Sequence, residues 1–304
     1  MKQLLSLFSG CGGSDLGFFN AGFTTIFANE YDKSIYPTYF RNFPDVTLNT
    51  RSITDIPLND YPKNVDGIIG SPPCQSWSSA GAKRGINDPR GKLFYNYVDI
   101  VNYVQPKFFV AENVHGIISK NNINKFKEIL GLFKDYNVEY KLLNANDYGV
   151  AQDRKRVIII GYHKSLNKIP NFPEPLQYKP VMKDVLNNCS LNNDLINDGY
   201  SPHFLSRQRV RGFDEPSFTI LASSRFIPFH PSSPKMIKDG NVFKFAAGIY
   251  SRLSVRNCAA IQSFPDAFEF IYENARNGYK MIGNAVPPKM AQIIAETIKK
   301  DLYV

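Results

Sequence analysis

The amino-acid sequence predicts an α/β protein with a large domain built on a parallel sheet and a smaller, irregular second domain. Short apolar runs alternate with amphipathic stretches over the first 160 residues, which is the pattern of βαβ units. Beyond Lys164 this periodicity is lost, and proline and asparagine become frequent between Lys168 and Pro202. We therefore expect one domain over 1–170 and 270–304 and a second domain over 171–269.

The elements of the large domain are expected in a regular order along the chain. Apolar runs predict strands at Leu4–Phe8, Thr25–Asn29, Gly67–Ile69, Phe108–Ala111, Lys141–Asn144 and Val157–Gly161. Amphipathic stretches predict helices over much of Asp15–Ala21, Ser34–Asn42, Leu93–Val104 and Ile123–Tyr136. After Pro287-Pro288, one face of a last helix is marked by Met290, Ile293, Ile294 and Ile298.

Composition limits the class of protein. Hydrophobic residues make up 43% of the 304 residues, which supplies a sizeable core and argues against disorder. The apolar runs have the length of strands, so no membrane span or signal peptide is expected. The four cysteines form no CxxC pair and no metal-ligand spacing, which predicts a reduced, intracellular protein without a metal. The net charge of +9 suits a polyanionic partner, although charge alone is weak support.

A glycine-rich turn follows the first predicted strand. Gly10, Gly12 and Gly13 let the backbone turn tightly and approach a ligand closely. Glu30 lies at the end of the second strand, where a carboxylate can accept hydrogen bonds from ribose hydroxyls, and Tyr31 could stack on an adenine. The GxGxxG spacing is absent, which favours a nucleoside ligand without a pyrophosphate over a dinucleotide. A plain tight connection is the alternative.

Cys74 follows two prolines at the end of the apolar run 65–69. Proline fixes its own φ and biases the preceding residue towards extended geometry, so the thiol is expected on a rigid platform after a strand. Open α/β sheets bind ligands at such strand ends, which makes Cys74 a candidate nucleophile. The alternative is a buried cysteine that acts as a small hydrophobic residue.

A carboxylate and two guanidiniums are predicted at the same edge of the sheet. Glu112 follows the strand Phe108–Ala111, and Arg154 and Arg156 precede the strand Val157–Gly161. The plainer readings are a carboxylate at a helix N-terminus and a solvated charged turn. A thiol, an acid and guanidiniums together suit attack on an electron-poor heteroaromatic ring: the thiolate adds, the acid protonates a ring nitrogen, and arginine holds an exocyclic oxygen.

These motifs, in this order, resemble those of the DNA (cytosine-5)-methyltransferases. The resemblance rests on the proline-cysteine motif, on Glu112-Asn113-Val114, on Gln152-x-Arg154-x-Arg156 and on the run 283–287. It runs from Phe8 to Pro287. It is strongest towards bacterial restriction-modification enzymes that recognise GGCC, with shared runs at 28–34, 88–95 and 143–154. The resemblance implies a Rossmann-like, S-adenosylmethionine-dependent catalytic domain over 1–170 and 270–304, and a target-recognition domain over 171–269.

The resemblance also implies roles for individual residues. The S-adenosylmethionine site would comprise Phe8, Gly10, Gly12, Glu30, Tyr31, Ser52, Ile53, Pro73, Leu93, Asn284 and Val286. Glu112, Arg156 and the Ser71 carbonyl would hold a cytosine flipped out of the duplex, while Cys74 adds to C6 and a methyl group is transferred to C5. The run 76–92 is similar to a loop that closes over DNA, with Ser76, Lys83, Arg84 and Arg90 as DNA contacts.

Two positions depart from the family pattern. Ser52 stands where the family usually has an aspartate near the adenine amino group, and the spacing of Asp55 argues against its replacing that aspartate. Asn257 replaces a glutamate that is common in its motif. Neither residue touches the expected reaction centre, so weaker cofactor affinity is a more natural consequence than lost activity.

The second domain carries arginines suited to reading bases. Arg209, Arg211 and Arg225 flank the run 216–220, in which Thr219-Ile220 is similar to the family's threonine-leucine pair. Arginine can bind guanine O6 and N7 together, so these residues and Thr219 are candidate DNA contacts. A basic loop that binds only phosphates is the alternative.

The expected activity is cytosine-5 methylation of double-stranded DNA at GGCC or a related G·C-rich palindrome. We expect a bacterial, cytoplasmic, nucleoid-associated monomer whose cognate restriction endonuclease is a genetic rather than a binding partner. An RNA (tRNA) cytosine-5 methyltransferase and a non-catalytic nucleic-acid-binding relative are the two alternatives. The intact Cys74, Glu112 and Arg156 argue against the second of these.

Overall fold

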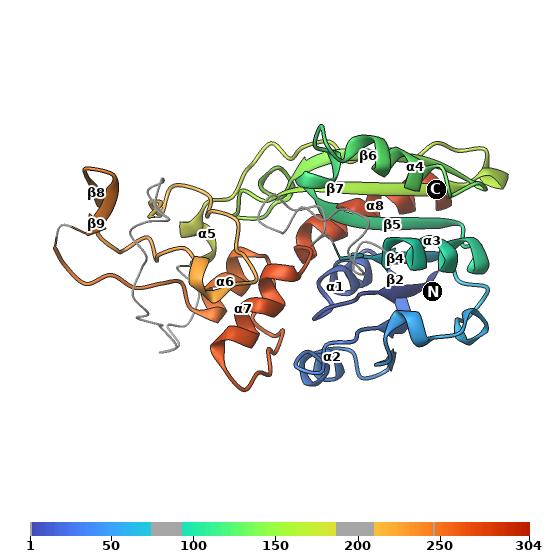
Figure 1. The fold of residues 1–304 in the computed structure, drawn as a ribbon, viewed down its shortest axis with the longest axis horizontal. Coiled ribbons are helices and arrows are strands. Elements are labelled where there is room, and N and C mark those ends of the chain that lie inside the picture. The colour runs from blue at the N-terminus through green and yellow to red at the C-terminus, as the bar shows by residue number, and fades with distance from the viewer. Residues whose placement is uncertain (1, 74–92, 187–209, 246) are drawn as a thin grey trace.

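A seven-stranded sheet forms the centre of the large domain, with helices on both faces (Figure 1). The computed structural model describes residues 2–73, 93–186, 210–245 and 247–304. The strand order β3-β2-β1-β4-β5-β7-β6 places β1 and β4 near the middle. The strands are β1 (Lys2–Leu7), β2 (Phe23–Asn29), β3 (Thr47–Asn49), β4 (Gly67–Gly70), β5 (Phe108–Val114), β6 (Tyr136–Asn144) and β7 (Lys155–His163). The α/β class and the Rossmann-like arrangement expected from the sequence are confirmed.

The expectation of a wholly parallel sheet is wrong at one strand. The strands from β1 to β5 pair in parallel, whereas β7 runs antiparallel to both of its neighbours, β5 and β6. The connection 145–154 between β6 and β7 is short and contains only one turn of 3₁₀ helix. A parallel crossover needs a dozen or more residues, so this connection reverses the chain instead.

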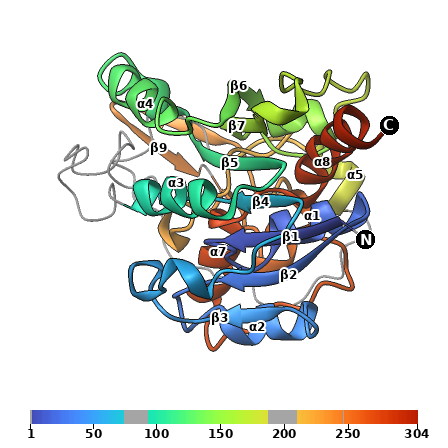
Figure 2. The same ribbon diagram turned by 90° about the vertical axis from the view of Figure 1, so that its right-hand side faces the viewer.

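Helices lie on both faces of the sheet (Figure 2), and an apolar core fills the space between helices and sheet on each face. On one face, β1 and β5 pack against α3 (Leu93–Val104) and α4 (Ile123–Leu130). On the other face, α1 (Gly13–Asn20) and α8 (Pro288–Tyr303) cover the sheet. The prediction of the last helix is therefore confirmed. This helix lies in the same layer as the first helix.

Several element boundaries differ from the expectation. The helix α4 ends at Leu130 rather than Tyr136, because Gly131 caps it and Tyr136 already begins β6. The helix α2 (Tyr36–Asn42) begins two residues later than expected, and β3 was not expected. Further unexpected elements are α5 (Met182–Leu186), β8 (Met236–Asp239), β9 (Val242–Phe245), α6 (Val255–Ile261) and α7 (Ala275–Asn284).

The second domain is irregular in its described parts. Its only sheet among the described residues is the pair β8–β9, which shares a small apolar cluster with Val210 and Phe229. A larger core joins Cys11 of the glycine turn to Ile220, α6 and α7. This core contains residues from both sides of the expected boundary at 269 and 270, and the division of the chain there stays a prediction. Among the helices described, none is long and apolar enough to cross a membrane.

Candidate active site

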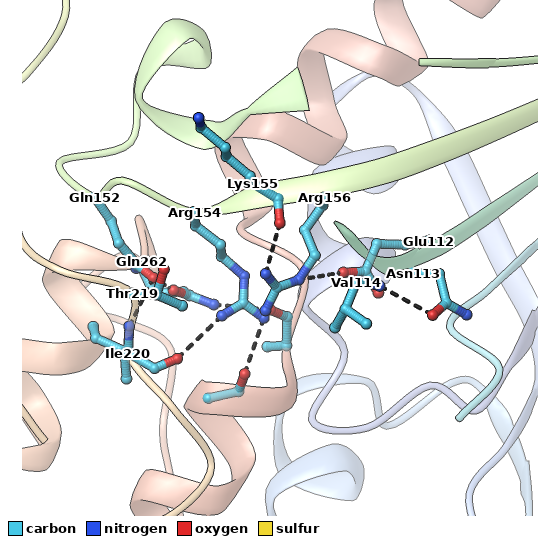
Figure 3. Close-up of polar contacts among 12 residues, drawn as sticks. Glu112, Asn113, Val114, Gln152, Arg154, Lys155, Arg156, Thr219, Ile220 and Gln262 are labelled. Carbon is cyan, nitrogen blue, oxygen red and sulfur yellow. Dashed lines mark hydrogen bonds and ion pairs between the residues drawn. The ribbon is translucent and has the colours of Figure 1, made fainter. Parts of the chain in front are cut away.

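An ion pair joins two of the predicted site residues at one edge of the sheet. The Nε of Arg156 donates to Oε1 of Glu112 at 2.8 Å, and the two side chains are 12% and 11% exposed (Figure 3). In the antiparallel β5–β7 register, Val114 lies opposite Arg156, and Glu112 lies two residues away on the same face. Because β7 is reversed, its first residues meet the carboxyl end of β5. A parallel β7 would have put Arg156 at the far edge.

The residues before Cys74 lie beside this pair. Parallel pairing sets Gly70 of β4 opposite Ala111 of β5, so the chain leaves β4 next to Glu112. The buried Asn113 then donates from Nδ2 to the Pro72 carbonyl at 3.2 Å, which ties the proline platform to β5. A small cavity at this edge is lined by Ser14, Gly70, Glu112 and Val286 among others. Cys74 itself lies outside the described residues.

Cys11 is a buried cysteine of a different kind. Its side chain is 1% exposed, and burial raises the pKa of its thiol to about 12. A thiol with so high a pKa supplies almost no thiolate near neutral pH, and the thiolate is the nucleophile. Cys11 therefore serves the apolar core that it shares with Ile220, α6 and α7, as a small hydrophobic residue.

The glycine turn has an unusual backbone, with left-handed φ angles at three of its residues. Phe8, Gly10 and Gly12 adopt φ angles of 53°, 56° and 90°, so the chain alternates in and out of the left-handed region. A Cβ on Gly12 would lie 2.1 Å from the Phe43 ring. Left-handed geometry at a bulky residue such as Phe8 costs on the order of 1–3 kcal/mol and is typical of binding sites.

Glu30 holds this turn in place. Its Oε2 accepts from the Gly10 backbone N–H at 2.9 Å, and its Oε1 accepts from that of Asp32 at 2.8 Å. Burial raises the pKa of the Glu30 carboxyl, and the backbone donors partly offset that rise. Tyr31, beside it, is 69% exposed, which leaves its ring open for stacking.

The other expected cofactor residues surround the same strand ends. Ile53 is buried in the core, while the Ser52 hydroxyl shares a 2.8 Å hydrogen bond with Thr54. Pro73 and Leu93 are partly exposed, Asn284 is exposed at the end of α7, and Val286 is buried beside the cavity that Glu112 lines. A Cβ on Gly10 would meet nothing within 4 Å, so the turn borders open space. An open turn, a carboxylate and an exposed ring fit a nucleoside-type cofactor such as S-adenosylmethionine.

Arg154 lies apart from the ion pair. It is only 1% exposed and donates to the carbonyls of Ile220, Gly283 and Ala285 at 2.9–3.1 Å (Figure 3). The sequence predicted that both arginines project towards a substrate, but Arg154 and Arg156, two residues apart at one strand end, have different partners. Arg156 pairs with Glu112, and Arg154 joins segments of backbone.

Arg211 and Thr219 are also engaged within the protein. Nη1 of Arg211 donates to Asp153 Oδ2 at 2.6 Å and to the Pro216 carbonyl at 2.7 Å, and its guanidinium lies 4.0 Å from the centre of the Phe218 ring. The Thr219 hydroxyl donates to the Asp153 carbonyl at 2.6 Å. Of the expected DNA contacts, Arg225 is exposed. Ser76, Lys83, Arg84, Arg90 and Arg209 lie outside the described residues.

Sequence reasoning missed several residues that organise the site. Arg252 is 5% exposed and donates to the carbonyls of Ser224, Arg225 and Ile227, which fixes the loop that carries Arg225. Gln262, fully buried, donates to two carbonyls at the end of α7. Neither residue has a local sequence signal, because the sequence around a buried polar side chain does not differ from the sequence around an exposed one.

Asn257, one of the two departures from the family pattern, takes part in a helix cap. The Ser254 hydroxyl accepts from the Asn257 N–H at 3.0 Å, and Asn257 Oδ1 accepts from the Ser254 N–H at 3.1 Å. This is a capping box at the start of α6, in which a glutamate or glutamine is the usual partner. The asparagine thus keeps both hydrogen bonds of the motif.

Known proteins resemble this chain over nearly its whole length. The type II methyltransferase M.FnuDI of Fusobacterium nucleatum is 50% identical, over 99% of this chain and 95% of its own length. M.NgoPII of Neisseria gonorrhoeae is 46% identical, over 99% of this chain and 96% of its own length. The solved Entamoeba histolytica methyltransferase EhMeth shares the fold, with a TM-score of 0.77, 19% identity and coverage of 100% of this chain and 99% of its own. The profile of C-5 cytosine-specific DNA methylases matches residues 2–300, and the chain therefore belongs to this family of DNA (cytosine-5-)-methyltransferases.

Proposed function

We propose that this chain is the modification enzyme of a type II restriction-modification system, and that it methylates C5 of a cytosine flipped out of duplex DNA. The observation that carries the proposal is the Glu112–Arg156 pair, 2.8 Å apart, at the strand end where the proline platform leads into Cys74. An acid, a guanidinium and a thiol at one edge are the groups that addition to a cytosine ring requires.

The cofactor residues lie at the neighbouring strand ends. Glu30 would accept hydrogen bonds from the ribose hydroxyls, Tyr31 would stack on the adenine, and the backbone of the glycine turn would line the rest of the site. When bound, S-adenosylmethionine supplies the methyl group. Ser52 offers only a hydroxyl near the adenine, where the family's aspartate would offer a full negative charge, so we expect a modest loss of affinity from this position.

The chemistry begins with the Cys74 thiolate. It forms a bond to C6 of the cytosine, and the electron pair of the C5–C6 double bond moves into the ring as Glu112 donates a proton to N3. The ring then has enamine character and is nucleophilic at C5, where it takes up the methyl group. A water molecule then takes the C5 proton, the Cys74 thiolate leaves C6, and the N3 proton returns to the Glu112 carboxylate, which restores the aromatic ring.

Glu112 and Arg156 act as a unit in this scheme. Neutral cytosine is a poor electrophile at C6, and an ionised carboxylate facing the N3 lone pair would repel it, so Glu112 must carry a proton in the reacting complex. Arg156 orients that carboxyl through Nε, and its Nη1 donates to the Lys155 carbonyl at 2.8 Å, so Nη2 would donate to the exocyclic oxygen of the base. The ring must leave the stack because neither the thiol nor the methyl donor can reach it in the duplex.

The proposed target is GGCC or a closely related G·C-rich palindrome, with the inner cytosine modified. Support comes from the likeness of the runs 28–34, 88–95 and 143–154 to enzymes of that specificity, and from the exposed Arg225 on a loop fixed by Arg252. Arg211, held by Asp153 and Pro216, is better suited to shaping the recognition segment than to reading bases. One recognition domain can read both half-sites of a short palindrome, so we propose that the enzyme acts as a monomer on nucleoid DNA.

The test is methyl transfer from labelled S-adenosylmethionine to duplex DNA and, separately, to tRNA, followed by bisulfite mapping of the DNA. We expect label in DNA, at C5 of the inner cytosine of a G·C-rich palindrome. Label in tRNA alone would favour the RNA methyltransferase, and no label in either would favour a non-catalytic relative. Methylation confined to A·T-rich sites would contradict the proposed specificity.

A further inference from the structure

We propose that the buried amides Gln152 and Gln262, together with Arg154, are positioning residues that couple target recognition to methyl transfer. They would hold the recognition segment, defined as residues 217–227, in register with the strand end that carries Glu112 and Arg156. The inference rests on the proposed function, because it takes that strand end as the place of reaction.

The two amides form a continuous hydrogen-bonded chain between three segments. Gln152 Oε1 accepts from the Ile220 N–H at 2.9 Å, and Gln152 Nε2 donates to Gln262 Oε1 at 2.5 Å. Gln262 Nε2 donates in turn to the carbonyls of Ile282 and Ala285 at 3.1 and 2.8 Å. Both side chains are 0% exposed, and Figure 3 shows them on one side of Arg154 and Ile220.

Arg154 binds the other backbone polar group of Ile220, which is its carbonyl. Its Nη1 donates to the Ile220 carbonyl at 3.1 Å, and its Nη2 donates to the carbonyls of Gly283 and Ala285. Both the N–H and the C=O of Ile220 are thus bound by side chains from the start of β7, two and four residues before Arg156. Any displacement of Ile220 relative to that strand end breaks bonds in a buried, low-dielectric site, where unpaired polar groups are costly.

Few other bonds fix the recognition segment to the sheet. Ser217 exchanges backbone hydrogen bonds with Ala151 and Asp153, and Thr219 donates to the Asp153 carbonyl. These contacts cover the first three residues of the segment. Beyond them, the segment passes directly over Gly283, where a Cβ would lie 2.3 Å from the Leu221 and Ala222 backbone. The amide chain and Arg154 therefore hold the segment where it turns towards the loop of Arg225.

This arrangement predicts a functional signature besides a structural one. Among the described residues, neither amide bonds to the glycine turn or to Glu30, and Gln262 reaches the expected cofactor site only through the carbonyls on either side of Asn284, so S-adenosylmethionine affinity should change far less than kcat. The position of the bound target relative to Glu112 should change when the amides are lost, and a misplacement of about 1 Å can cost on the order of 100-fold in rate. Both kcat and the choice of target sequence should change together.

The amide pair can be tested by Gln152→Met, Gln262→Met and the double variant, with Gln292→Met on α8 as the matched control. The assays are kcat on the cognate duplex, the ratio of cognate to singly mismatched methylation, and S-adenosylmethionine affinity by calorimetry, all well below each variant's melting temperature. We expect each single variant to lose about 10- to 100-fold in kcat and part of the discrimination, with cofactor affinity within about 2-fold of wild type. The double variant should lose little more than the worse single variant, because residues that act as a unit are non-additive.

Gln262→Glu provides a second measurement. A glutamate at 262 keeps the volume and can still accept from Gln152, but it cannot donate to the Ile282 and Ala285 carbonyls, so it should also lower kcat and discrimination. Wild-type kcat and discrimination in the folded variants, additive losses in the double variant, or losses that match only a fall in the folded fraction would overturn the inference. Failure of the proposed function is distinguishable, because wild-type protein would then transfer no methyl group to DNA.

Discussion

The sheet and the recognition lobe of this enzyme are held in shape by different kinds of bond. In the sheet, backbone pairing alone sets Val114 opposite Arg156 and so brings Arg156 to Glu112. In the lobe, which is the expected second domain 171–269, side chains bind backbone groups: Arg252 donates to the Arg225 carbonyl, Arg154 donates to the Ile220 carbonyl, and Gln152 accepts from the Ile220 N–H. Regular structure therefore positions the Glu112–Arg156 pair, while a few buried polar side chains position the segment that carries Ile220 and Arg225.

This contrast also separates what a substitution should do. A change at the strand ends should alter the rate and leave the choice of sequence intact, since the ladder persists without any one side chain. A change at a polar anchor of the lobe should alter the choice of sequence.

Glu112→Gln tests the sheet side of the comparison. Glutamine keeps a donor towards N3 but has no proton to transfer, so kcat should fall. The expected loss of transition-state stabilisation is about 2–4 kcal/mol, the scale of a key electrostatic group. Cofactor affinity and sequence choice should persist. The matched control is Glu139→Gln on the exposed side of β6, which should keep wild-type activity. Near-normal turnover of the Glu112 variant would contradict the assigned role.

Gly283→Ala tests the contact between α7 and the recognition segment. The new Cβ would lie 2.3 Å from the Leu221 carbonyl carbon and the Ala222 nitrogen, which are backbone atoms that cannot rotate away. We expect a loss of about 1–3 kcal/mol in the free energy of unfolding, despite the better helix propensity of alanine. In Gly131→Ala the Cβ meets nothing closer than 3.4 Å, and the free energy of unfolding of that variant should equal that of the wild type or slightly exceed it. Equal stability of the two variants would show that the segment gives way at no cost.

Arg225→Ala tests the lobe side. Arg225 is exposed on a loop that Arg252 fixes, so its loss should remove about 1–3 kcal/mol of discrimination between cognate and altered sites, with a smaller effect on kcat. Lys83→Ala is the comparison, because loss of a phosphate contact should weaken binding to all sequences alike. Competition binding with cognate and altered duplexes measures both. A uniform loss for Arg225→Ala would assign it to the phosphates instead.

Asp15→Asn gives the smallest effect and a pH dependence. Asp15 is 2% exposed and accepts from the hydroxyls of Ser6, Thr25 and Tyr39, and burial raises the pKa of its carboxyl. A raised pKa means that the folded state favours the protonated acid, so wild-type stability falls as the pH rises through the folded pKa. Asparagine does not titrate and can keep all three contacts, with Nδ2 donating to Ser6. The variant should therefore gain about 1 kcal/mol or less at pH 8 and less still at pH 5, measured by urea unfolding. A larger gain at pH 5 would reverse the sign and contradict this account.

The sequence predicted most of the large domain because its signals are local. Apolar runs marked six strands, and the glycine turn and Glu30 directly follow strands as expected, whereas Glu112, expected just after a strand, lies inside β5 two residues before its end. The direction of β7 could not be predicted in the same way, because the run 157–161 reads as a buried strand in either direction. The convergence of Arg156 and Glu112 on one edge was expected from their places near strand ends, and its physical cause, the antiparallel register, appears only in the structure.

The recognition lobe escaped prediction for the opposite reason. Arg154 reads as part of a charged, solvated turn, yet it is 1% exposed, since three carbonyls from distant segments meet its guanidinium. Gln262 and Arg252 are likewise defined by partners far away in sequence. No periodicity marks such residues, because a buried polar anchor is determined by the tertiary arrangement that it stabilises.

The central claim is that Cys74 attacks the cytosine at the edge shared by Glu112 and Arg156, and a covalent trap tests it most directly. A duplex with 5-fluorocytosine at the target position cannot lose a proton from C5, so the adduct should persist after methyl transfer. Wild-type protein with S-adenosylmethionine should give a protein–DNA adduct that survives denaturation, and Cys74→Ala should bind the same duplex and give none. An adduct of equal yield from the Cys74→Ala protein would contradict the account.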